Sequence, residues 1–209
     1  MNVKNKKIAL SIFISILVIG VVSALLLYLL SDRQDLSDVK TKGDVFLYNP
    51  DFNSDIMNEE EYLIKDRSIK YSDGFGTWDI FNGKDVLTDI KIDLFLIDYI
   101  NTLVAGDGEK LLGMYSQEVV KALKLSDMIT EQRIYETVFT EISAREVNDD
   151  TGSYFLYEFK AEYKIMRNDG TFRNDVSSNA VKAQYLTITK RGDDCLITGV
   201  VEYAIPNSK

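Results

Sequence analysis

The chain has 209 residues and a net charge of −9, with one cysteine and no histidine. This acidic balance, without a dense Lys/Arg stripe, offers no electrostatic basis for binding nucleic acid. The lone Cys195 excludes an intramolecular disulfide and a cysteine-based zinc site, and the lack of histidine removes the serine–histidine and cysteine–histidine catalytic arrangements. We therefore expect no cofactor, no metal site and no enzymatic activity.

An uncharged apolar run occupies residues 8–30 and is long enough for a helix that spans a bilayer. Lys4, Lys6 and Lys7 precede it, whereas acidic residues beginning at Asp32 dominate after it. The positive-inside rule then predicts a single-pass cell-membrane protein with a cytoplasmic N-terminus and an extracytoplasmic C-terminal domain. A cleaved signal peptide is the alternative, but the run is longer than a typical signal core and lacks a suitable cleavage site.

The predicted organisation is a cytoplasmic tail (1–7), a transmembrane helix (8–30), a partly ordered linker (31–85) and one domain (86–209). Within the linker, Trp78 and Phe81 could pack against the domain or form an exposed aromatic patch for a partner. We expect packing and keep these two residues as a candidate partner surface.

Apolar residues from Val86 onward recur every three or four positions, which predicts an amphipathic helix of about five turns. The helix is expected to end near the Gly-Asp-Gly sequence at 106–108. Shorter helical stretches are expected at 109–115 and 117–123, with Ser116 as the N-cap of the second.

The period then changes to two, most clearly between Phe155 and Ile165, where apolar residues alternate with Glu and Lys. Strands are predicted at 138–147, 155–165, 179–190 and 195–204. The predicted fold class is therefore α+β: after the transmembrane helix, a cone-like domain packs one long helix on a curved antiparallel sheet of about four strands.

This order of elements resembles the nuclear transport factor 2-like superfamily over residues 86–204. The resemblance rests on the helix from Phe95 to its Gly-Asp ending, on the short helix ending Met114-Tyr115-Ser116, and on the long-stranded meander. In overall layout the chain is similar to the bitopic scaffold subunits of type IV secretion (conjugation) machines. That similarity implies an envelope assembly, with other envelope proteins or self-association as the contacts.

The superfamily's cone can form a pocket, so the sheet tyrosines and their neighbours are candidate lining residues. Glu158 and Glu202 could supply a carboxylate with a raised pKa, although Glu158 is predicted to point away from the aromatic face. The candidate pocket-lining residues are Tyr157, Phe159, Tyr163, Tyr185 and Tyr203.

The leading hypothesis is a non-enzymatic, membrane-anchored extracytoplasmic interaction module. A small-ligand-binding or sensing domain, or less favoured an enzyme, is the alternative, and a modulator of cell-wall synthesis is a third possibility.

Overall fold

The computed structural model describes residues 48–81 and 90–201. Contacts between residues divide the chain into two compact units, with the boundary after Asp44. The description below concerns the second unit, residues 45–209.

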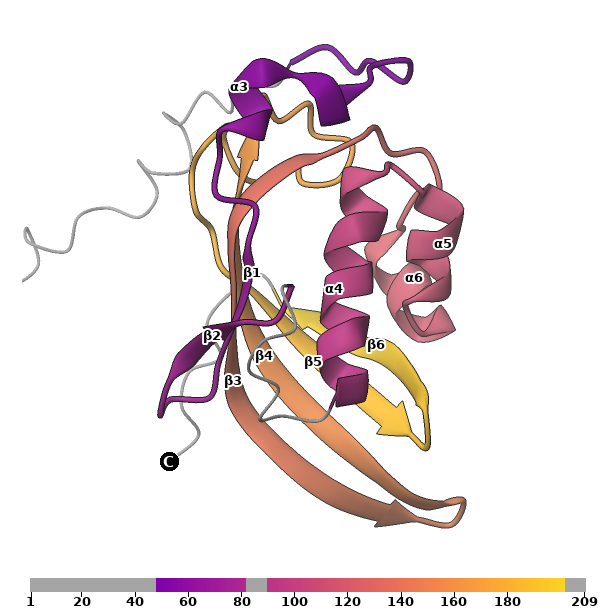
Figure 1. Cartoon of the computed structure of the whole chain (residues 1–209). Helices are drawn as coiled ribbons and strands as arrows, with labels where there is room; N and C mark the ends of the chain where they lie inside the picture. The colour runs from indigo at the N-terminus through magenta and orange to yellow at the C-terminus, as the bar shows by residue number, and fades with distance from the viewer. Residues whose placement is uncertain (1–47, 82–89, 202–209) are drawn as a thin grey trace, which may run out of the picture. The chain divides into compact units, whose positions relative to one another are not determined.

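Short helices and a sheet alternate along the described chain, labelled as in Figure 1. The elements are η1 (Ile56–Asn58), α3 (Glu60–Leu63), β1 (Ile69–Ser72), β2 (Thr77–Asp79), α4 (Ile90–Val104), α5 (Gly108–Gly113), α6 (Gln117–Leu123), β3 (Arg133–Asp149), β4 (Gly152–Met166), β5 (Gln184–Arg191) and β6 (Asp194–Val201).

The six strands form one mixed sheet in the order β2-β1-β3-β4-β5-β6. Strands β3 to β6 are an antiparallel meander, whereas β1 lies parallel to β3 and antiparallel to β2. A parallel pair needs a long crossover connection, and here that connection contains α4, α5 and α6. All three helices lie on one face of the sheet (Figure 1).

A β-bulge in β3 keeps the apolar residues of this long strand facing the helices. The register advances by three residues from Tyr135 to Val138 while β4 advances by two, and the extra residue Glu136 has a φ of 52°. Ile134 and Phe139 are an odd number of residues apart, yet both belong to the main core because the bulge reverses the alternation.

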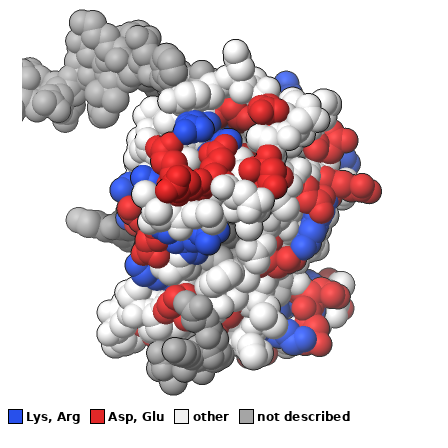
Figure 2. All heavy atoms as spheres, turned by 45° about the horizontal axis from the view of Figure 1, so that its top comes forward, with Lys and Arg blue, Asp and Glu red and all other residues white. Residues whose placement is uncertain are grey.

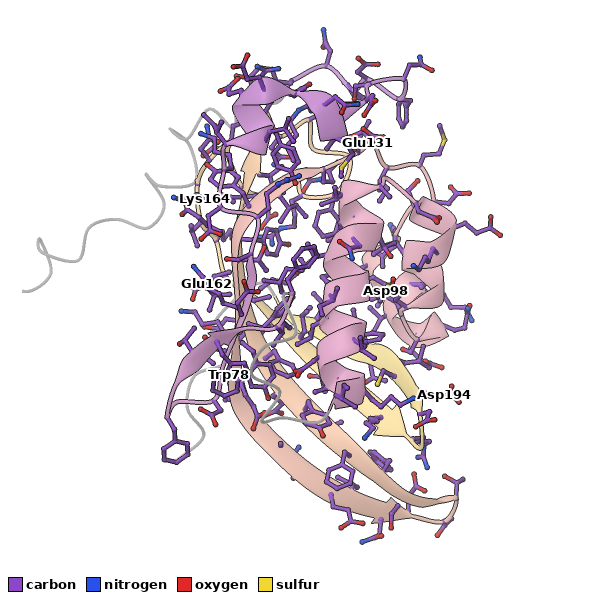
Figure 3. All side chains as sticks on the ribbon, in the orientation of Figure 1. Trp78, Asp98, Glu131, Glu162, Lys164 and Asp194 are labelled. Carbon is purple, nitrogen blue, oxygen red and sulfur yellow. The ribbon has the colours of Figure 1, made fainter. Side chains whose placement is uncertain are left out.

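The main core fills the space between α4 and the sheet. From α4, Leu96 and Leu103 are fully buried, and from the sheet Phe159, Ala161 and Ile188 are fully buried. Residues of the opposite parity point away from the helices, as Figure 3 shows for Glu162 and Lys164. A smaller cluster on the N-terminal side contains Ile56, Tyr62, Tyr135 and Met166.

Two glycines make the tight junction after α4 possible. Gly106 has a φ of +66°, which a side chain rarely adopts, and the side chain of Asp107 caps α5 by accepting the N–H of Lys110 at 2.9 Å. A Cβ on Gly108 would lie 1.8 Å from the carbonyl oxygen of Asp127. The sequence between α6 and β3 can therefore pack directly on this turn.

The predicted fold class is wrong. The sheet has six strands and is mixed, the described helices are short, and the domain is mostly sheet, not one long helix on four antiparallel strands. The two missed strands, β1 and β2, come from the predicted linker. They are four and three residues long, too short for alternation to identify them; β1 forms because β3 offers an edge and an apolar face, and β2 forms against β1.

The predicted localisation is also corrected. In residues 48–81 and 90–201 no helix is long and apolar enough to cross a membrane. The run at 8–30, on which the predicted transmembrane helix depended, lies outside the described residues. We therefore withdraw the assignment to the cell membrane.

Candidate functional site: an interaction surface

Exposed apolar side chains are concentrated in residues 48–81, called here the N-terminal segment. This segment makes up about a quarter of the described residues but contains seven of their sixteen exposed large hydrophobic side chains. Exposed apolar side chains that are frequent in one stretch of sequence are candidates for contacts with a partner. The seven are Tyr48, Phe52, Met57, Leu63, Ile64, Phe75 and Phe81.

The most exposed of them, Phe75, is held out by an ordered turn between β1 and β2. Its side chain is 99% exposed. The Asp73 carboxylate accepts the backbone N–H groups of Phe75 at 2.9 Å and of Gly76 at 3.1 Å, and Gly74 supplies the positive φ of 87°. The ring is thus held in solvent by an ordered backbone. A partner that covers it would cause little further loss of conformational entropy.

Strand β2 forms one edge of the sheet. In the described residues it pairs with β1 alone. The N–H of Ile80 bonds to the carbonyl of Ile69 at 2.9 Å, so the alternation of an antiparallel ladder makes Tyr71 and Trp78 the next hydrogen-bonded pair. The backbone groups of Thr77 and Asp79 therefore point away from β1.

The opposite edge of the sheet, at β6, is covered. The N–H of Ile197 bonds to the carbonyl of Met114 at 2.8 Å, and the N–H of Ser116 bonds to the carbonyl of Ile197 at 2.9 Å. The connection between α5 and α6 thus occupies the middle of β6. A covered edge offers no backbone groups to another chain, so the middle of β6 is a poor candidate for strand addition.

The two residues of the predicted partner surface, Trp78 and Phe81, differ in their contacts and in their exposure. Trp78 stacks on Tyr71 with ring centroids 5.3 Å apart and packs against the main core at the sheet edge, where Figure 3 labels it. Its Nε1 is buried and has no hydrogen-bond partner within the described residues. Phe81 is 52% exposed, and its N–H bonds to the Asp79 carboxylate at 2.9 Å.

A cavity of about 630 Å³ opens beside the hairpin, between α3, β1, α4 and β3. Its wall combines apolar side chains with a few polar groups, including Asp66 and Arg67. Hydrogen bonds from the Ser68 hydroxyl and then from Lys70 lower the pKa of Asp66 to about 2, and the Arg67 guanidinium lies 5.5 Å from the ring centre of Tyr62. The other lining residues are Met57, Ser68, Ile69, Asp79, Phe81, Ile100, Asn101, Val104, Ile134 and Thr137.

The predicted pocket-lining residues do not form one group. Tyr157, Phe159 and Tyr163 on β4 are buried and face the helices. Tyr185 pairs with Lys160 and so lies on the other face of the sheet, and Tyr203 lies outside the described residues. Aromatic rings occupy the inner face of the sheet. Tyr157 stacks on Phe159 with ring centroids 6.1 Å apart, and Tyr71 meets Phe159 edge-on with ring centroids 5.6 Å apart.

A buried polar network that the sequence did not reveal surrounds Tyr163. Its hydroxyl accepts a hydrogen bond from Arg173 at 3.1 Å and donates to Gln184 at 3.3 Å. Arg173 is 3% exposed and binds the Asp175 carboxylate through two hydrogen bonds of 2.6 and 2.9 Å, while Lys182 pairs with the same carboxylate at 2.6 Å. The network ties the connection between β4 and β5 to the core. The sequence pattern indicates only a turn there.

Other buried tyrosines donate hydrogen bonds. The Tyr71 hydroxyl donates to the Glu141 carboxylate, and the Tyr99 and Tyr115 hydroxyls lie 3.1 Å apart. Burial raises the pKa of each of these tyrosines well above its usual range, so the hydroxyls stay protonated at neutral pH.

Charges near α3 join the N-terminal segment to the body of the domain. Arg133 on β3 binds Glu59 through hydrogen bonds of 2.8 and 2.5 Å, and Arg167 pairs with Glu61 at 2.6 Å. The bonds from Arg133 lower the pKa of Glu59. Figure 2, which brings this end forward, shows acidic side chains gathered around basic ones. In the described residues no group of three or more His, Cys, Asp or Glu side chains could hold a metal ion.

Comparisons with protein-family models, with curated proteins and with solved structures found no match. The resemblance to the nuclear transport factor 2-like superfamily stays a prediction.

Proposed function

We propose that the domain is a protein-interaction module whose contact surface is the N-terminal segment, with the β1–β2 hairpin at its centre. The observation that carries the proposal is Phe75, which is 99% exposed and is held on an ordered turn in a stretch rich in exposed apolar side chains. Exposed apolar side chains on an ordered backbone can supply the anchors of a protein interface.

The energetics favour Phe75 as the main anchor. Burying one phenylalanine side chain stabilises a complex by about 1.5–3 kcal/mol, and aromatic residues are enriched among those that dominate binding. Asp73 and Gly74 already fix the turn, so little backbone freedom is lost on binding. The exposed ring has no comparable role within the fold.

The test uses the full chain, tagged and cross-linked in its native cells, with cross-linked peptides identified by mass spectrometry. We expect cross-links from the N-terminal segment to a protein surface, and we expect Phe75→Ser and Ile64→Ser to reduce them several-fold. Ile142→Ser is the matched control, because Ile142 is 55% exposed but lies on β3. Equal loss in the control, or no cross-link from residues 48–81, would contradict the proposal.

Small-ligand binding is a second candidate, favoured by the 630 Å³ cavity, whose volume lies in the usual range for ligand sites. Val104 lines it and is partly buried. A ligand found by thermal-shift screening of the full chain should lose its stabilising effect in Val104→Phe, which fills the space. Unchanged stabilisation in that variant would remove this candidate site.

A further inference from the structure

We infer that this chain self-associates through the outer part of β3, with two copies paired antiparallel across a twofold axis at Val147. The inference goes beyond the proposed function, because it concerns the end of the β3–β4 hairpin and not the N-terminal segment. It is carried by a length of strand edge whose sequence is complementary in charge to a second copy of itself.

Strand β3 is much longer than its neighbour on one side. β1 pairs with it only from Thr137 to Thr140, whereas β3 continues to Asp149. Beyond Thr140, β3 has no strand partner on that side within residues 48–81 and 90–201. Figure 1 shows β3 and β4 extending together past the N-terminal end of α4, and residues 144–146 are exposed. The outer part of β3 therefore presents a strand edge to solvent.

The hairpin turn determines which backbone groups face this edge. Asp149 pairs with Gly152 around a two-residue loop, and the pair that flanks such a loop exchanges hydrogen bonds. The alternation of an antiparallel ladder makes Val147 the next residue of β3 that bonds to β4. Glu146 and Asn148, on either side of Val147, direct their N–H and C=O groups toward the edge. A second strand could bind these groups without breaking any bond within the sheet.

An axis at Val147 brings the right residues together. Val147 of one copy then lies opposite Val147 of the other, and Glu146 lies opposite Asn148 of the second copy. The outward-directed backbone groups of these two residues meet on both sides of the axis, so the pair closes as a twofold dimer. In the same register Arg145 lies opposite Asp149 of the second copy, and this pair of opposite charges also occurs twice.

Side-chain charges favour this register over its neighbours, which the alternation of the backbone groups also allows. An axis at Glu146 would place two carboxylates directly opposite each other, and an axis at Arg145 would do the same with two guanidinium groups. An axis at Asn148 would place Glu146 opposite Asp150. Like charges directly opposite each other destabilise a strand pair. Of these four registers, the one centred on Val147 avoids such contacts.

Both charged residues of the proposed pair already have partners in their own chain, and both can accept another. Arg145 lies 3.8 Å from the Glu158 carboxylate, which is too long for a hydrogen bond, so its donors remain for Asp149 of the second copy. Hydrogen bonds from Arg191 and then from Thr151 lower the pKa of Asp149 to about 2, so this carboxyl is ionised at neutral pH. In a chain with a net charge of −9, two such pairs offset part of the repulsion between copies.

Charge reversal in the full chain tests the register by sedimentation. Arg145→Glu and Asp149→Arg should each weaken self-association, because each places like charges opposite each other twice per dimer. An equal mixture of the two variants should associate again, since both cross-strand pairs then join opposite charges. Arg145→Gln removes the attraction alone and should raise the dissociation constant by about 2- to 30-fold. Lys164→Glu is the control, because Lys164 lies on the same face of the sheet at the other end of β4, and it should leave association unchanged.

A wild-type chain that stays monomeric at every concentration, or a mixture that associates no better than the separate variants, would overturn the inference. So would a loss of association in Lys164→Glu as large as in Arg145→Glu. The proposed function is tested separately at Phe75 and does not depend on these results.

A disulfide locates the axis. In a Cys195→Ser background, Val147→Cys should form a disulfide between two copies, because directly opposite residues that exchange no backbone hydrogen bonds have Cα atoms about 4.5 Å apart. Arg145→Cys is the matched control, because in this register two residues at position 145 lie on opposite sides of the axis and too far apart to join. Equal yields from the two variants, or no disulfide from Val147→Cys, would contradict an axis at Val147.

Discussion

The N-terminal segment (48–81) exposes a larger share of its large apolar side chains than the body of the domain (90–201), although Ile56, Tyr62 and Tyr71 of the segment are buried. In the body, Phe159 is fully buried and meets other rings, whereas Phe75 in the segment is 99% exposed on an ordered turn. The packed rings of the body therefore stabilise the fold, whereas the exposed ring of the segment is available for binding. The comparison teaches that both roles coexist in one sheet, because Ile69 and Tyr71 of β1 are buried while the turn that joins β1 to β2 exposes Phe75.

The same substitution at these two phenylalanines should sharpen the comparison most. Phe159→Ala should lower the free energy of unfolding by about 3–5 kcal/mol, because it leaves a cavity among packed rings. Phe75→Ala should change it by no more than about 0.5 kcal/mol. Denaturant titration of both full-length variants measures the difference, with Phe159→Leu as a milder variant if Phe159→Ala does not fold. Similar effects at the two sites would break the comparison.

The buried charge network should come next in size. Arg173→Met leaves the Asp175 carboxylate without its two-bond partner in a part-buried site, and a loss of about 3 kcal/mol is expected. Arg191→Met is the matched control, because Arg191 pairs with Asp149 at the surface and should cost less than about 1 kcal/mol. Urea unfolding of both variants should separate them clearly, and equal losses would show that the network has no special role.

Acid should weaken the body through Asp175. Burial raises the pKa of this carboxyl, but hydrogen bonds from Arg173 and Lys182 outweigh burial and lower it to about 2, from an ordinary value of 3.8. Because the folded pKa is the lower one, the stabilisation is fully present above about pH 4 and is lost as the pH falls toward 2.

Asp175→Asn should therefore differ from the wild type at neutral pH by on the order of 1–2 kcal/mol more than it does near pH 2. Unfolding curves at several pH values measure this difference. If the difference in unfolding free energy between the two proteins stays constant across that pH range, the lowered pKa of Asp175 is contradicted.

The smallest effect should follow from loosening the segment's attachment. Glu59→Gln weakens the paired hydrogen bonds to Arg133 by about 1 kcal/mol and should affect the segment alone. Hydrogen exchange should accelerate around Tyr62 in α3, while amides in β4 keep their rates. Glu60→Gln is the control, because the only described ion pairs of α3 and its cap involve Glu59 and Glu61. Faster exchange throughout the domain would mean that the segment and the body unfold together.

The body was readable from sequence because its elements are long or sharply capped. Alternation from Phe155 to Ile165 identifies β4, and the Gly-Asp-Gly sequence at 106–108 marks the helix junction, where Gly106 has a positive φ and Asp107 caps α5. These signals depend on residues that are close together in the chain, so they can be recognised in a single sequence. The bulge at Glu136 was not predictable, because it depends on the pairing with β4.

The segment was not readable for the opposite reason. Strands β1 and β2 are four and three residues long, and the pairing of β1 with β3 joins residues about 70 positions apart. Trp78 and Phe81 are conspicuous as aromatic residues in a polar stretch, but the most exposed ring, Phe75, lies between two glycines, where the sequence indicates only a turn. Arg173 was missed because nothing local distinguishes a buried arginine from a surface one.

Cross-linking of the full chain in its native cells tests the central claim most directly. Cross-links from residues 48–81 to a partner protein should fall several-fold in Phe75→Ser and stay unchanged in Ile142→Ser, because Phe75 is 99% exposed on the turn between β1 and β2 whereas Ile142 lies on β3. Cross-links of equal yield in the wild type and in Phe75→Ser would contradict the account.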